Sequence, residues 1–241
     1  MLHVVCLKWG TKYSVEYVNK LYGMVKRNLN LPFSFHCLTE DPAGIRPEVN
    51  VLPLPDLGLH GWWYKLYLFK QDFYGLEGQM LFLDLDVVIS GSLDDLVNYD
   101  PGHFYAAHDC KPGTVNSSVL RFDIGSMPWI WESFWAQRET VASMLHGDQD
   151  WIYRVVPTIR EFPFPYIVSY RNHCKARTPI AGGIIGRWLR MFGLFRPYKK
   201  AVLPEGARVV LFFGKPDPVD VQDGPYDKYR HAPWVGQLWQ Y

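Results

Sequence analysis

The sequence predicts an α/β protein whose mostly parallel central sheet is flanked by helices. Two observations lead to this fold class. Short apolar runs typical of buried strands recur through the first third of the chain, and segments with helical spacing separate them. The chain has 241 residues, so we expect a single domain over residues 1–241 that folds without disulfides or a metal.

The elements of the first third follow in order. Residues 4–7 form a short apolar run and predict a buried strand. Ser14 suits the N-cap of a helix that ends before Pro32. The apolar residues at helical spacing in this helix are Val15, Val18, Tyr22, Val25 and Leu29. Alternation of apolar and polar residues over 33–37 predicts a second strand, and residues 49–54 predict a short third one.

The later elements are less regular. A helix is expected over 63–74, and residues 80–89 are expected to form one strand with Asp84 and Asp86 near its C-terminal end. A helix over 128–146 has proline in its first turn, where proline is tolerated. The other expected strands are 104–107, 118–122 and 209–213. Because ligands of such sheets bind beyond the carboxyl ends of the strands, the Asp pair is the first candidate for chemistry.

The composition excludes several classes of protein. There are 25 Lys and Arg residues against 24 Asp and Glu residues, which excludes a basic nucleic-acid-coating protein and argues against disorder. The N-terminus lacks the features of a signal peptide, and no apolar run approaches the roughly 18 residues of a spanning helix. We therefore expect a cytoplasmic protein without a nucleic-acid partner. No C-x-x-C pair occurs, and we expect free thiols at Cys6, Cys37, Cys110 and Cys174.

The strongest chemical signal is the pair Asp84 and Asp86, which has three apolar residues on either side. Burying two carboxylates this close is costly unless a cation or protons compensate the charge. A divalent metal that also holds substrate phosphates would compensate it, because hard cations take carboxylate and phosphate oxygens. The alternative is a strand end at which both side chains reach water.

One enzyme class with such a pair is the haloacid-dehalogenase-type phosphatase. Its signature, an apolar run followed by Asp-x-Asp-x-Thr/Val, is satisfied by residues 81–88. Asp84 would then be the nucleophile and Mg²⁺ the electrophile. That motif normally follows the first strand, whereas several elements precede it here. No convincing Ser/Thr and Lys motifs follow, although residues 147–150 could act as the last acidic motif.

A second class fits a longer series of motifs. The chain resembles a glycogenin-like, family 8-type glycosyltransferase of the GT-A (Rossmann-like) fold, or its bacterial lipopolysaccharide-synthesising relatives. The resemblance spans roughly residues 3–216. After the opening strand and turn, the motifs in family order are Gly61–Leu66, Phe82–Asp86, Asn116–Phe122, Gly147–Ile152 and Gly214–Pro216. Each motif alone is weak, and the ordered set is fairly specific.

The resemblance implies a role for each matching residue. Asp84 and Asp86 would hold Mn²⁺ or Mg²⁺ against the donor diphosphate, where the metal acts as a Lewis acid. The implied donor-binding residues are Lys8, Trp9, Gly10, Thr11, Lys65, Asp84, Leu85, Asp86, Asn116, Gly214 and Lys215. Asp148 and Gln149 match the acidic-Gln pair beside the reacting sugar carbon.

Each of these residues also has an ordinary structural explanation. Lys65 could be a surface lysine with a buried stem, and Asn116 could belong to a plain turn that enters a strand. Asp148 could be the N-cap of a helix through Trp151. Lys215 could be an ordinary turn lysine.

One residue departs from the family pattern. Phe213 stands just before Gly214-Lys215-Pro216, where the family usually has a histidine that is the third protein ligand of the metal. Phenylalanine cannot coordinate a metal. The site could use two carboxylates with donor oxygens and water, borrow His231 or Asp217, bind the metal weakly, or belong to an inactive homologue.

A basic amphipathic segment spans about residues 171–200. No Asp or Glu occurs between Phe162 and Pro204, while apolar and aromatic residues alternate with Lys and Arg. Such a stretch suits an anionic membrane surface or a lipid-linked acceptor, and we expect peripheral membrane contact through residues 187–200. The alternative is a solvated helix packed on the domain.

The sequence thus predicts a metal-dependent glycosyltransferase. It would move a sugar from a nucleotide-diphosphate sugar, expected to be a UDP-sugar, to a carbohydrate or lipid-linked acceptor in surface glycan synthesis. Family resemblance favours retention of the anomeric configuration. The alternatives are a non-catalytic homologue that binds nucleotide sugars, and the phosphatase that uses Asp84.

Overall fold

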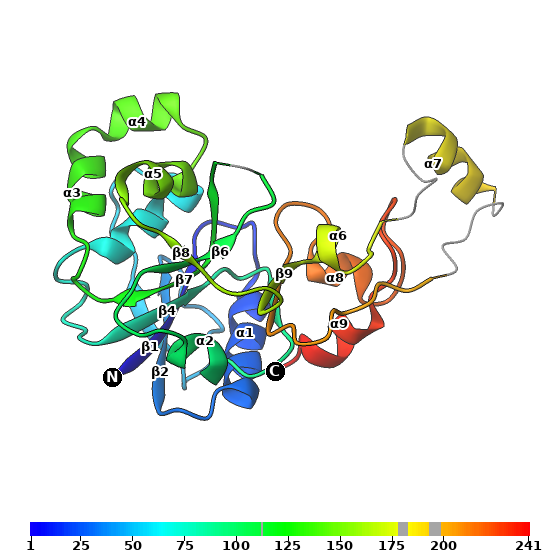
Figure 1. Ribbon diagram of the computed structural model, residues 1–241, viewed down its shortest axis with the longest axis horizontal. Helices are drawn as coiled ribbons and strands as arrows, with labels where there is room; N and C mark the ends of the chain where they lie inside the picture. The colour runs from blue at the N-terminus through cyan, green and yellow to red at the C-terminus, as the bar shows by residue number, and fades with distance from the viewer. Residues whose placement is uncertain (112, 178–182, 193–198) are drawn as a thin grey trace. The chain divides into compact units, whose positions relative to one another are not determined.

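The computed structural model describes residues 1–111, 113–177, 183–192 and 199–241 (Figure 1). These residues divide into two compact units, each assembled from three stretches of chain. The first unit is Met1–Tyr22, Asn30–Leu85 and Asp94–Phe162, and the second is Gly23–Leu29, Asp86–Leu93 and Pro163–Tyr241. The chain therefore passes from one unit to the other between Leu85 and Asp86, inside the motif that the sequence singled out.

A seven-stranded sheet forms the centre of the first unit (Figure 1). Its strands, in spatial order, are β3 (Asn50–Pro53), β2 (Phe33–Thr39), β1 (Leu2–Lys8), β4 (Gln79–Leu83), β7 (Val115–Asp123), β6 (Tyr105–His108) and β8 (Arg160–Glu161). Only β7 runs antiparallel to its neighbours β4 and β6, so four of the six pairings are parallel. The predicted mostly parallel sheet flanked by helices is confirmed.

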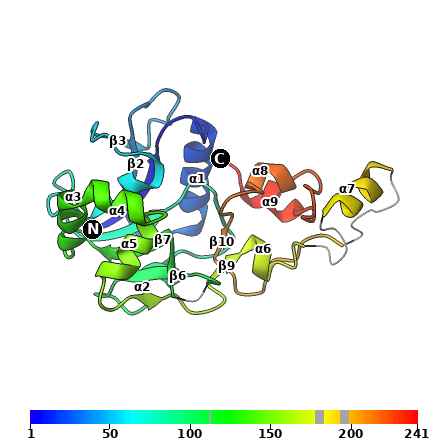
Figure 2. The ribbon, with the colours of Figure 1, turned by 90° about the horizontal axis from the view of Figure 1, so that it is seen from above.

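Helices cover both faces of this sheet. One face packs against the 3-10 helix η1 (Gly61–Phe69), α3 (Trp129–Ala136) and α5 (Asp148–Val155), and α4 (Arg138–Met144) follows α3. Val5, Phe82 and Leu120 share a core with side chains of these helices. The first part of α1 (Val15–Asn28) lies on the other side of the sheet (Figure 2), where Tyr22 meets Phe35 of β2 edge-on with ring centroids 5.5 Å apart.

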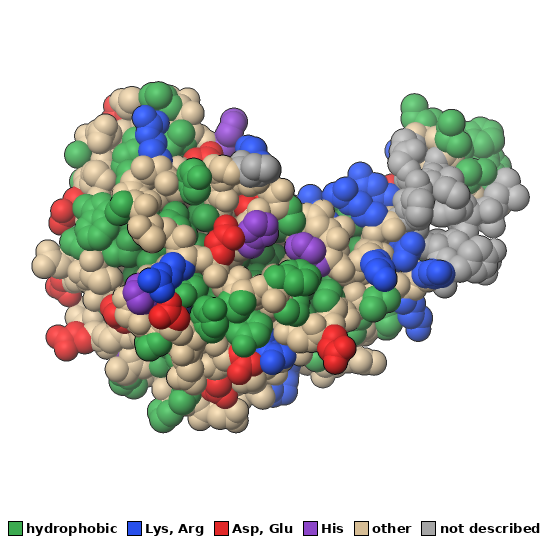
Figure 3. Space-filling model, viewed as in Figure 1, with side chains coloured by type: hydrophobic (Ala, Val, Ile, Leu, Met, Phe, Trp, Pro, Cys, Tyr) green, Lys and Arg blue, Asp and Glu red, His purple; other side chains and the backbone are tan. Residues whose placement is uncertain are grey.

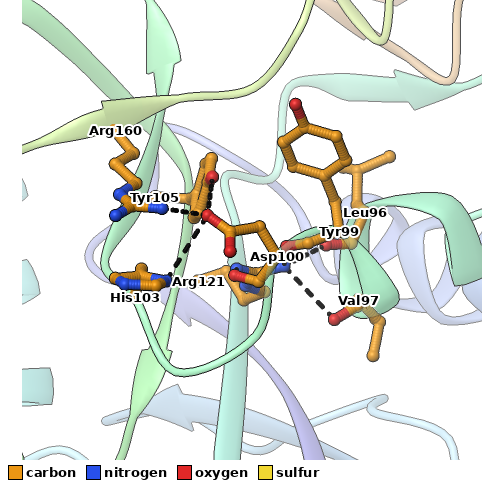
Figure 4. A network of polar contacts seen from close by, with 8 residues as sticks. All are labelled: Leu96, Val97, Tyr99, Asp100, His103, Tyr105, Arg121 and Arg160. Carbon is orange, nitrogen blue, oxygen red and sulfur yellow. Dashed lines mark hydrogen bonds and ion pairs between the residues drawn. The ribbon is translucent and has the colours of Figure 1, made fainter.

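A buried arginine holds the end of the short helix α2 (Asp94–Asn98) against the sheet (Figure 4). The Arg121 side chain on β7 is fully buried. It donates hydrogen bonds to the carbonyl oxygens of Leu96, Val97, Tyr99 and Asp100. The last carbonyls of any helix lack partners within the helix, so Arg121 satisfies groups that would otherwise be buried without one. The Asp100 carboxylate in turn accepts from Tyr105 and pairs with Arg160.

The second unit has a small sheet of its own. Its strands are β5 (Val87–Ile89), β10 (Val209–Leu211) and β9 (Ile167–Ser169), with β5 antiparallel and β9 parallel to β10. Its helices are α6 (Tyr170–His173), α7 (Gly183–Met191), α8 (Pro218–Val221) and α9 (Pro233–Leu238). In the part of the chain that the structure describes, no helix is both long and apolar enough to cross a membrane.

Most of the early elements match their predictions. The strands expected over 4–7, 33–37 and 49–54 are β1, β2 and β3, and the helix after Ser14 is α1. All four cysteines are free, and all but the exposed Cys110 are buried.

Three expected elements were wrong. Residues 80–89 do not form one strand, because β4 ends at Leu83 and β5 begins at Val87 in the other sheet. Leu85 in the intervening turn is buried, so an unbroken apolar run conceals the turn. Residues 63–74 contain the shorter 3-10 helix, and the helix over 128–146 is divided at Gln137 into α3 and α4.

Candidate functional site

The Lys65 ammonium is the centre of a polar cluster in the first unit. Its Nζ lies 3.0 Å from Asp84 Oδ1 and 3.5 Å from Asp148 Oδ2. It also lies 3.1 Å from Ser117 Oγ and 3.2 Å from the Ser117 carbonyl oxygen. Residues from three other parts of the sequence therefore share the buried Lys65 ammonium. Ser117 is the member that sequence reasoning missed, although it lies within the Asn116–Phe122 motif.

Each member of the cluster comes from a different element. Lys65 belongs to η1, whose apolar side chains pack on the sheet and hold the ammonium 5.1 Å from the Phe82 ring. Asp84 follows the last residue of β4, and its backbone N–H donates to Ser118 O of β7 at 2.9 Å. Because β1, β2 and β4 are parallel, this cluster lies at the carboxyl end of β4, where ligands of such sheets bind.

Lys65 is a buried lysine and not a surface one. Its side chain is 5 % exposed, and the Asp148 side chain is equally buried, while Asp84 is 28 % exposed. An ammonium this deeply buried requires negative partners, and two carboxylates supply them. The exposed face of Asp84 leaves this carboxylate able to meet a ligand.

Asp148 is the first residue of α5 and not its N-cap. Gly147 holds the N-cap position without a side-chain hydrogen bond, and a Cβ there would lie 3.0 Å from Trp62 Nε1. Asp150 instead accepts a hydrogen bond from the backbone N–H of His146. The N-cap explanation for Asp148 is therefore wrong, because its carboxylate points to Lys65. Gln149 is partly exposed beside it.

The electrostatics of Asp148 follow from its burial. Burial raises the pKa of this carboxyl group, and nearby Asp84 raises it further. The Lys65 ammonium and a hydrogen bond from Ser117 act in the opposite direction. Among the residues that the structure describes, none donates a hydrogen bond to the buried Asp148 Oδ2. Lys65 is thus the charge that favours ionised Asp148.

Asn116 lies in β7 and is buried. Its Oδ1 accepts a hydrogen bond from the backbone N–H of Ser118 at 2.9 Å. The ladder between β6 and β7 shifts register between Ala106 and Ala107, opposite this stretch. Such bulges re-aim side chains next to functional sites, and here Asn116 immediately precedes Ser117.

The turn after β1 also reaches η1. Lys8 is buried, and its Nζ lies 4.0 Å from Asp41 Oδ2. Gly10 has a φ of +63°, and its backbone N–H donates a hydrogen bond to the Glu40 carboxylate. The partly exposed Trp9 ring lies 6.3 Å from the Tyr64 ring. Thr11 is exposed. The exposed Trp9 ring therefore lies beside Tyr64, the buried residue that precedes Lys65 in η1.

The remaining predicted site residues belong to the second unit. Asp86 is buried, and Gly214 and Lys215 follow β10. Lys215 Nζ pairs with Asp217 at 2.8 Å and with Asp220 at 3.0 Å, and both carboxylates raise its pKa. The structure therefore shows this lysine in an acidic setting rather than as an isolated turn residue.

Phe213 has a cation beside it. The Arg171 guanidinium lies 5.5 Å from the Phe213 ring and donates a hydrogen bond to the Lys215 carbonyl oxygen. Both alternative third ligands are engaged within the second unit, because His231 Nε2 lies 3.0 Å from the Gln222 carbonyl oxygen and Asp217 pairs with Lys215.

Asp84 and Asp86 are the carboxylates that the sequence offers to a metal ion. Among the residues that the structure describes, no group of three or more His, Cys, Asp or Glu side chains could hold a metal ion. Asp84 and Asp86 flank a buried leucine and supply two hard oxygen donors. Mn²⁺ and Mg²⁺ accept such carboxylates together with phosphate oxygens and water.

Comparisons with known proteins find solved structures with a similar fold. No protein-family model and no curated protein sequence matches the chain. The glycosyltransferase GlyE of Streptococcus pneumoniae TIGR4 superposes with a TM-score of 0.64 and 15 % identity over 98 % of this chain and 60 % of that chain. This protein therefore spans about three-fifths of the GlyE chain.

Two structures of LgtC are also similar. The galactosyltransferase LgtC in complex with donor and acceptor sugar analogs has a TM-score of 0.57 and 16 % identity, over 90 % of this chain and 88 % of that chain. An active-site mutant of LgtC has a TM-score of 0.59 and 15 % identity, over 90 % and 89 %. The chain therefore resembles GT-A glycosyltransferases of family 8 in its fold, as its motifs predict.

Proposed function

We propose that the protein is a glycosyltransferase that transfers a sugar from a nucleotide-diphosphate sugar, specifically a UDP-sugar, to a carbohydrate or lipid-linked acceptor. The observation that best supports this proposal is the cluster in which Lys65 Nζ contacts the carboxylates of both Asp84 and Asp148. Three motifs that the resemblance assigns to donor binding and catalysis thereby lie together at the end of β4. The fold shared with glycosyltransferases supports the same conclusion.

The donor would bind across the carboxyl end of the sheet. Trp9 offers an aromatic surface for the nucleoside, beside Lys8, Gly10 and Thr11 in the turn after β1. The other donor contacts that we propose are Lys65, Asp84, Leu85, Asp86, Asn116, Gly214 and Lys215. Lys215 would neutralise the phosphate charge that develops as the sugar departs.

A divalent cation, Mn²⁺ or Mg²⁺, would be held by Asp84 and Asp86 and would supply Lewis-acid stabilisation of the departing diphosphate. The Asp84 side chain is partly exposed and therefore accessible to a diphosphate. Phe213 contributes no ligand to this site.

Asp148 and Gln149 would act at the sugar carbon. An ionised Asp148 stabilises the positive charge that develops there in an oxocarbenium-like transition state. Lys65 keeps that carboxylate ionised although burial opposes it. The reaction would retain the anomeric configuration, with the leaving phosphate of the donor taking the proton of the acceptor hydroxyl.

The setting that we propose is surface glycan synthesis at the cytoplasmic face of a membrane. A lipid-linked acceptor would be presented there, and residues 187–200 would contact the membrane. Part of that range, residues 193–198, lies outside the described residues.

The phosphatase alternative gains no support from the fold. Asp84 follows β4 and not the first strand, where the phosphatase motif normally lies, and the solved structures that the fold resembles are glycosyltransferases. A non-catalytic homologue would share the whole donor site. Only a turnover assay distinguishes it from an active enzyme.

The test is donor turnover with a panel of UDP-sugars and Mn²⁺, with release of UDP as the readout. One donor should be hydrolysed slowly, and Asp148→Asn should reduce that rate roughly 100-fold. The matched control Asp123→Asn changes an exposed carboxylate at the far end of β7 and should leave the rate unchanged. Nucleotide binding without turnover of any donor would indicate the non-catalytic homologue. Turnover of a generic phosphomonoester that needs Asp84 would indicate the phosphatase.

A further inference from the structure

Trp62 is an exposed tryptophan beside the candidate site. It is the second residue of η1, and 55 % of its surface is exposed. The next residue, Trp63, is buried and stacks on the Phe134 ring with centroids 5.3 Å apart. Trp63 therefore belongs to the core, and Trp62 does not. A single exposed tryptophan is not unusual, so its position relative to the Lys65 cluster decides what it can do.

The Trp62 indole lies against the backbone of Gly147. A Cβ atom on Gly147 would be 3.0 Å from Trp62 Nε1 and 3.1 Å from Trp62 Cδ1, so a side chain there would push the indole away. Gly147 is buried, and its backbone is extended, a conformation that any residue can adopt. The close approach of the indole therefore explains the glycine. It also places the Trp62 ring against the residue that immediately precedes Asp148.

Trp62 and Lys65 lie on the same side of η1. Side chains three residues apart eclipse one another in a 3-10 helix, one turn or about 6 Å apart along its axis. The contacts agree with this spacing, because Lys65 Nζ lies 3.5 Å from Asp148 Oδ2 while the Trp62 indole rests on Gly147. Both side chains therefore face the start of α5.

Polar side chains follow directly after this contact. Asp148 and the partly exposed Gln149 come next in the chain. Over α3, α4 and α5 of the first unit, Figure 3 shows apolar side chains at the surface among polar ones. A pyranose ring requires such a combination, because its C–H groups pack on an aromatic face while its hydroxyls need hydrogen-bond partners.

We propose that Trp62 binds the acceptor, with a pyranose ring of the acceptor stacked on the exposed face of the indole. The inference rests on the proposed function, because it takes Asp148 and Gln149 as the residues beside the reacting sugar carbon. The acceptor would then end in a pyranose residue, whether or not a lipid carries the glycan. Trp62 would position the attacking hydroxyl and take no part in the chemical step.

Its position favours the acceptor over the donor as the occupant. The diphosphate half of the proposed site is built on Asp84, which contacts Lys65 from the end of β4. Trp62 instead contacts the segment that carries Asp148. The nucleoside already has the Trp9 ring in the proposed function. Trp62 is thus available to the second substrate, whose hydroxyl has to reach the sugar carbon beside Asp148.

The test compares sugar transfer with donor hydrolysis. The protein, with Mn²⁺ and the UDP-sugar that it turns over, is supplied with the methyl glycosides of glucose, galactose and N-acetylglucosamine. Trp62→Ala should lower the kcat/KM of transfer at least about tenfold more than it lowers donor hydrolysis, because the surface under the acceptor is lost. Trp62→Tyr keeps an aromatic ring and should retain most of the transfer. The matched control Trp129→Ala removes another exposed tryptophan of the first unit and should behave like the parent chain.

Binding is also measured directly, through the indole N–H signal of Trp62 in proton–nitrogen NMR spectra. The signal is identified by its loss in Trp62→Tyr. We expect at least one of the glycosides to shift it in the presence of UDP and Mn²⁺, and the indole signal of Trp129 to stay in place.

Three outcomes would overturn the inference. They are a Trp62 signal that no glycoside shifts, undiminished transfer by Trp62→Ala, and equal losses of transfer and hydrolysis in that variant. The last would assign the ring to the donor sugar. A UDP titration of the parent chain keeps the two proposals distinct. A parent chain that binds no UDP contradicts the glycosyltransferase, whereas one that binds UDP but shows no shift of the Trp62 signal contradicts only the acceptor site.

Discussion

Lys65 Nζ lies 3.0 Å from Asp84 Oδ1, although the two residues belong to a 3-10 helix and to the turn after a strand. This ion pair connects the residue that would hold the metal and diphosphate to a buried cation. The same ammonium faces Asp148, the carboxylate that we propose stabilises the sugar carbon. In the proposed function, donor binding and catalysis would therefore both depend on the buried Lys65 charge.

Replacing Lys65 should affect both stability and donor binding. Lys65→Met leaves Asp84 and Asp148 without their shared cation, and breaking a buried pair in this way costs about 3 kcal/mol in the free energy of unfolding. UDP affinity should fall with it, while Lys65→Arg should keep part of both. Chemical unfolding and UDP titration measure the two effects. Lys70→Met, which changes an exposed lysine just after η1, is the control. A Lys65→Met protein as stable and as tight-binding as the parent would contradict this role.

The pH dependence of turnover should report Asp148. Burial raises the pKa of this carboxyl group above the ordinary value for aspartate, and Lys65 opposes the rise. If the ionised form is the active one, the rate should fall as the pH drops through that raised pKa. Lys65→Met should then move the acid limb to higher pH, because the opposing charge is gone. An acid limb that stays in place in Lys65→Met would exclude Asp148 as its source.

The buried Arg121 should matter for folding and not for chemistry. Arg121→Met removes the donors to four carbonyl oxygens at the end of α2 and leaves those groups without partners. We expect a loss of roughly 3 kcal/mol or more in the free energy of unfolding. Arg138→Met, at an exposed arginine, should cost about 0.5 kcal/mol or less. Equal losses for the two variants would refute the capping role.

Stability should also fall in mild acid because of His36. Burial lowers the pKa of His36 to about 4, and the neighbouring His3 acts in the same direction. Between pH 6.5 and about 4 the unfolded chain binds a proton at this histidine that the folded chain does not. The free energy of unfolding should therefore decrease as the pH falls through that window. His36→Gln should flatten the slope, and His146→Gln, at an exposed histidine, should not. An unchanged slope in His36→Gln would assign the effect to other groups.

Local periodicity was sufficient for the elements that are buried in a regular way. β1, α1 and β2 follow their apolar patterns because the core lies on the expected faces of these elements. The motif around Asp84 misled the strand prediction, since Leu85 is as buried as a strand residue although it lies in a turn. Nothing local marks the change of sheet at that point, because the pairing of β5 with β10 joins residues far apart in sequence.

The sequence predicted which residues form most of the candidate site, but not how those residues contact one another. The motif order pointed to Lys65, Asp84 and Asp148, which the structure brings together. It did not indicate Ser117, whose hydroxyl and carbonyl oxygens complete the lysine's surroundings. Arg121 was also missed, because an arginine inside an apolar strand gives no sign of the helix end that it caps. Such tertiary contacts depend on elements that meet only in the folded chain.

The most direct test of the donor site is a calorimetric titration with UDP, with GDP as the comparison nucleotide, first in Mn²⁺ and then in EDTA. The same titration is repeated on Asp86→Ala and on the control Asp123→Ala. We expect UDP to bind with a Kd on the order of micromolar. Binding should vanish in EDTA and in Asp86→Ala and persist in Asp123→Ala. Absence of binding for either nucleotide under every condition would contradict the proposed glycosyltransferase.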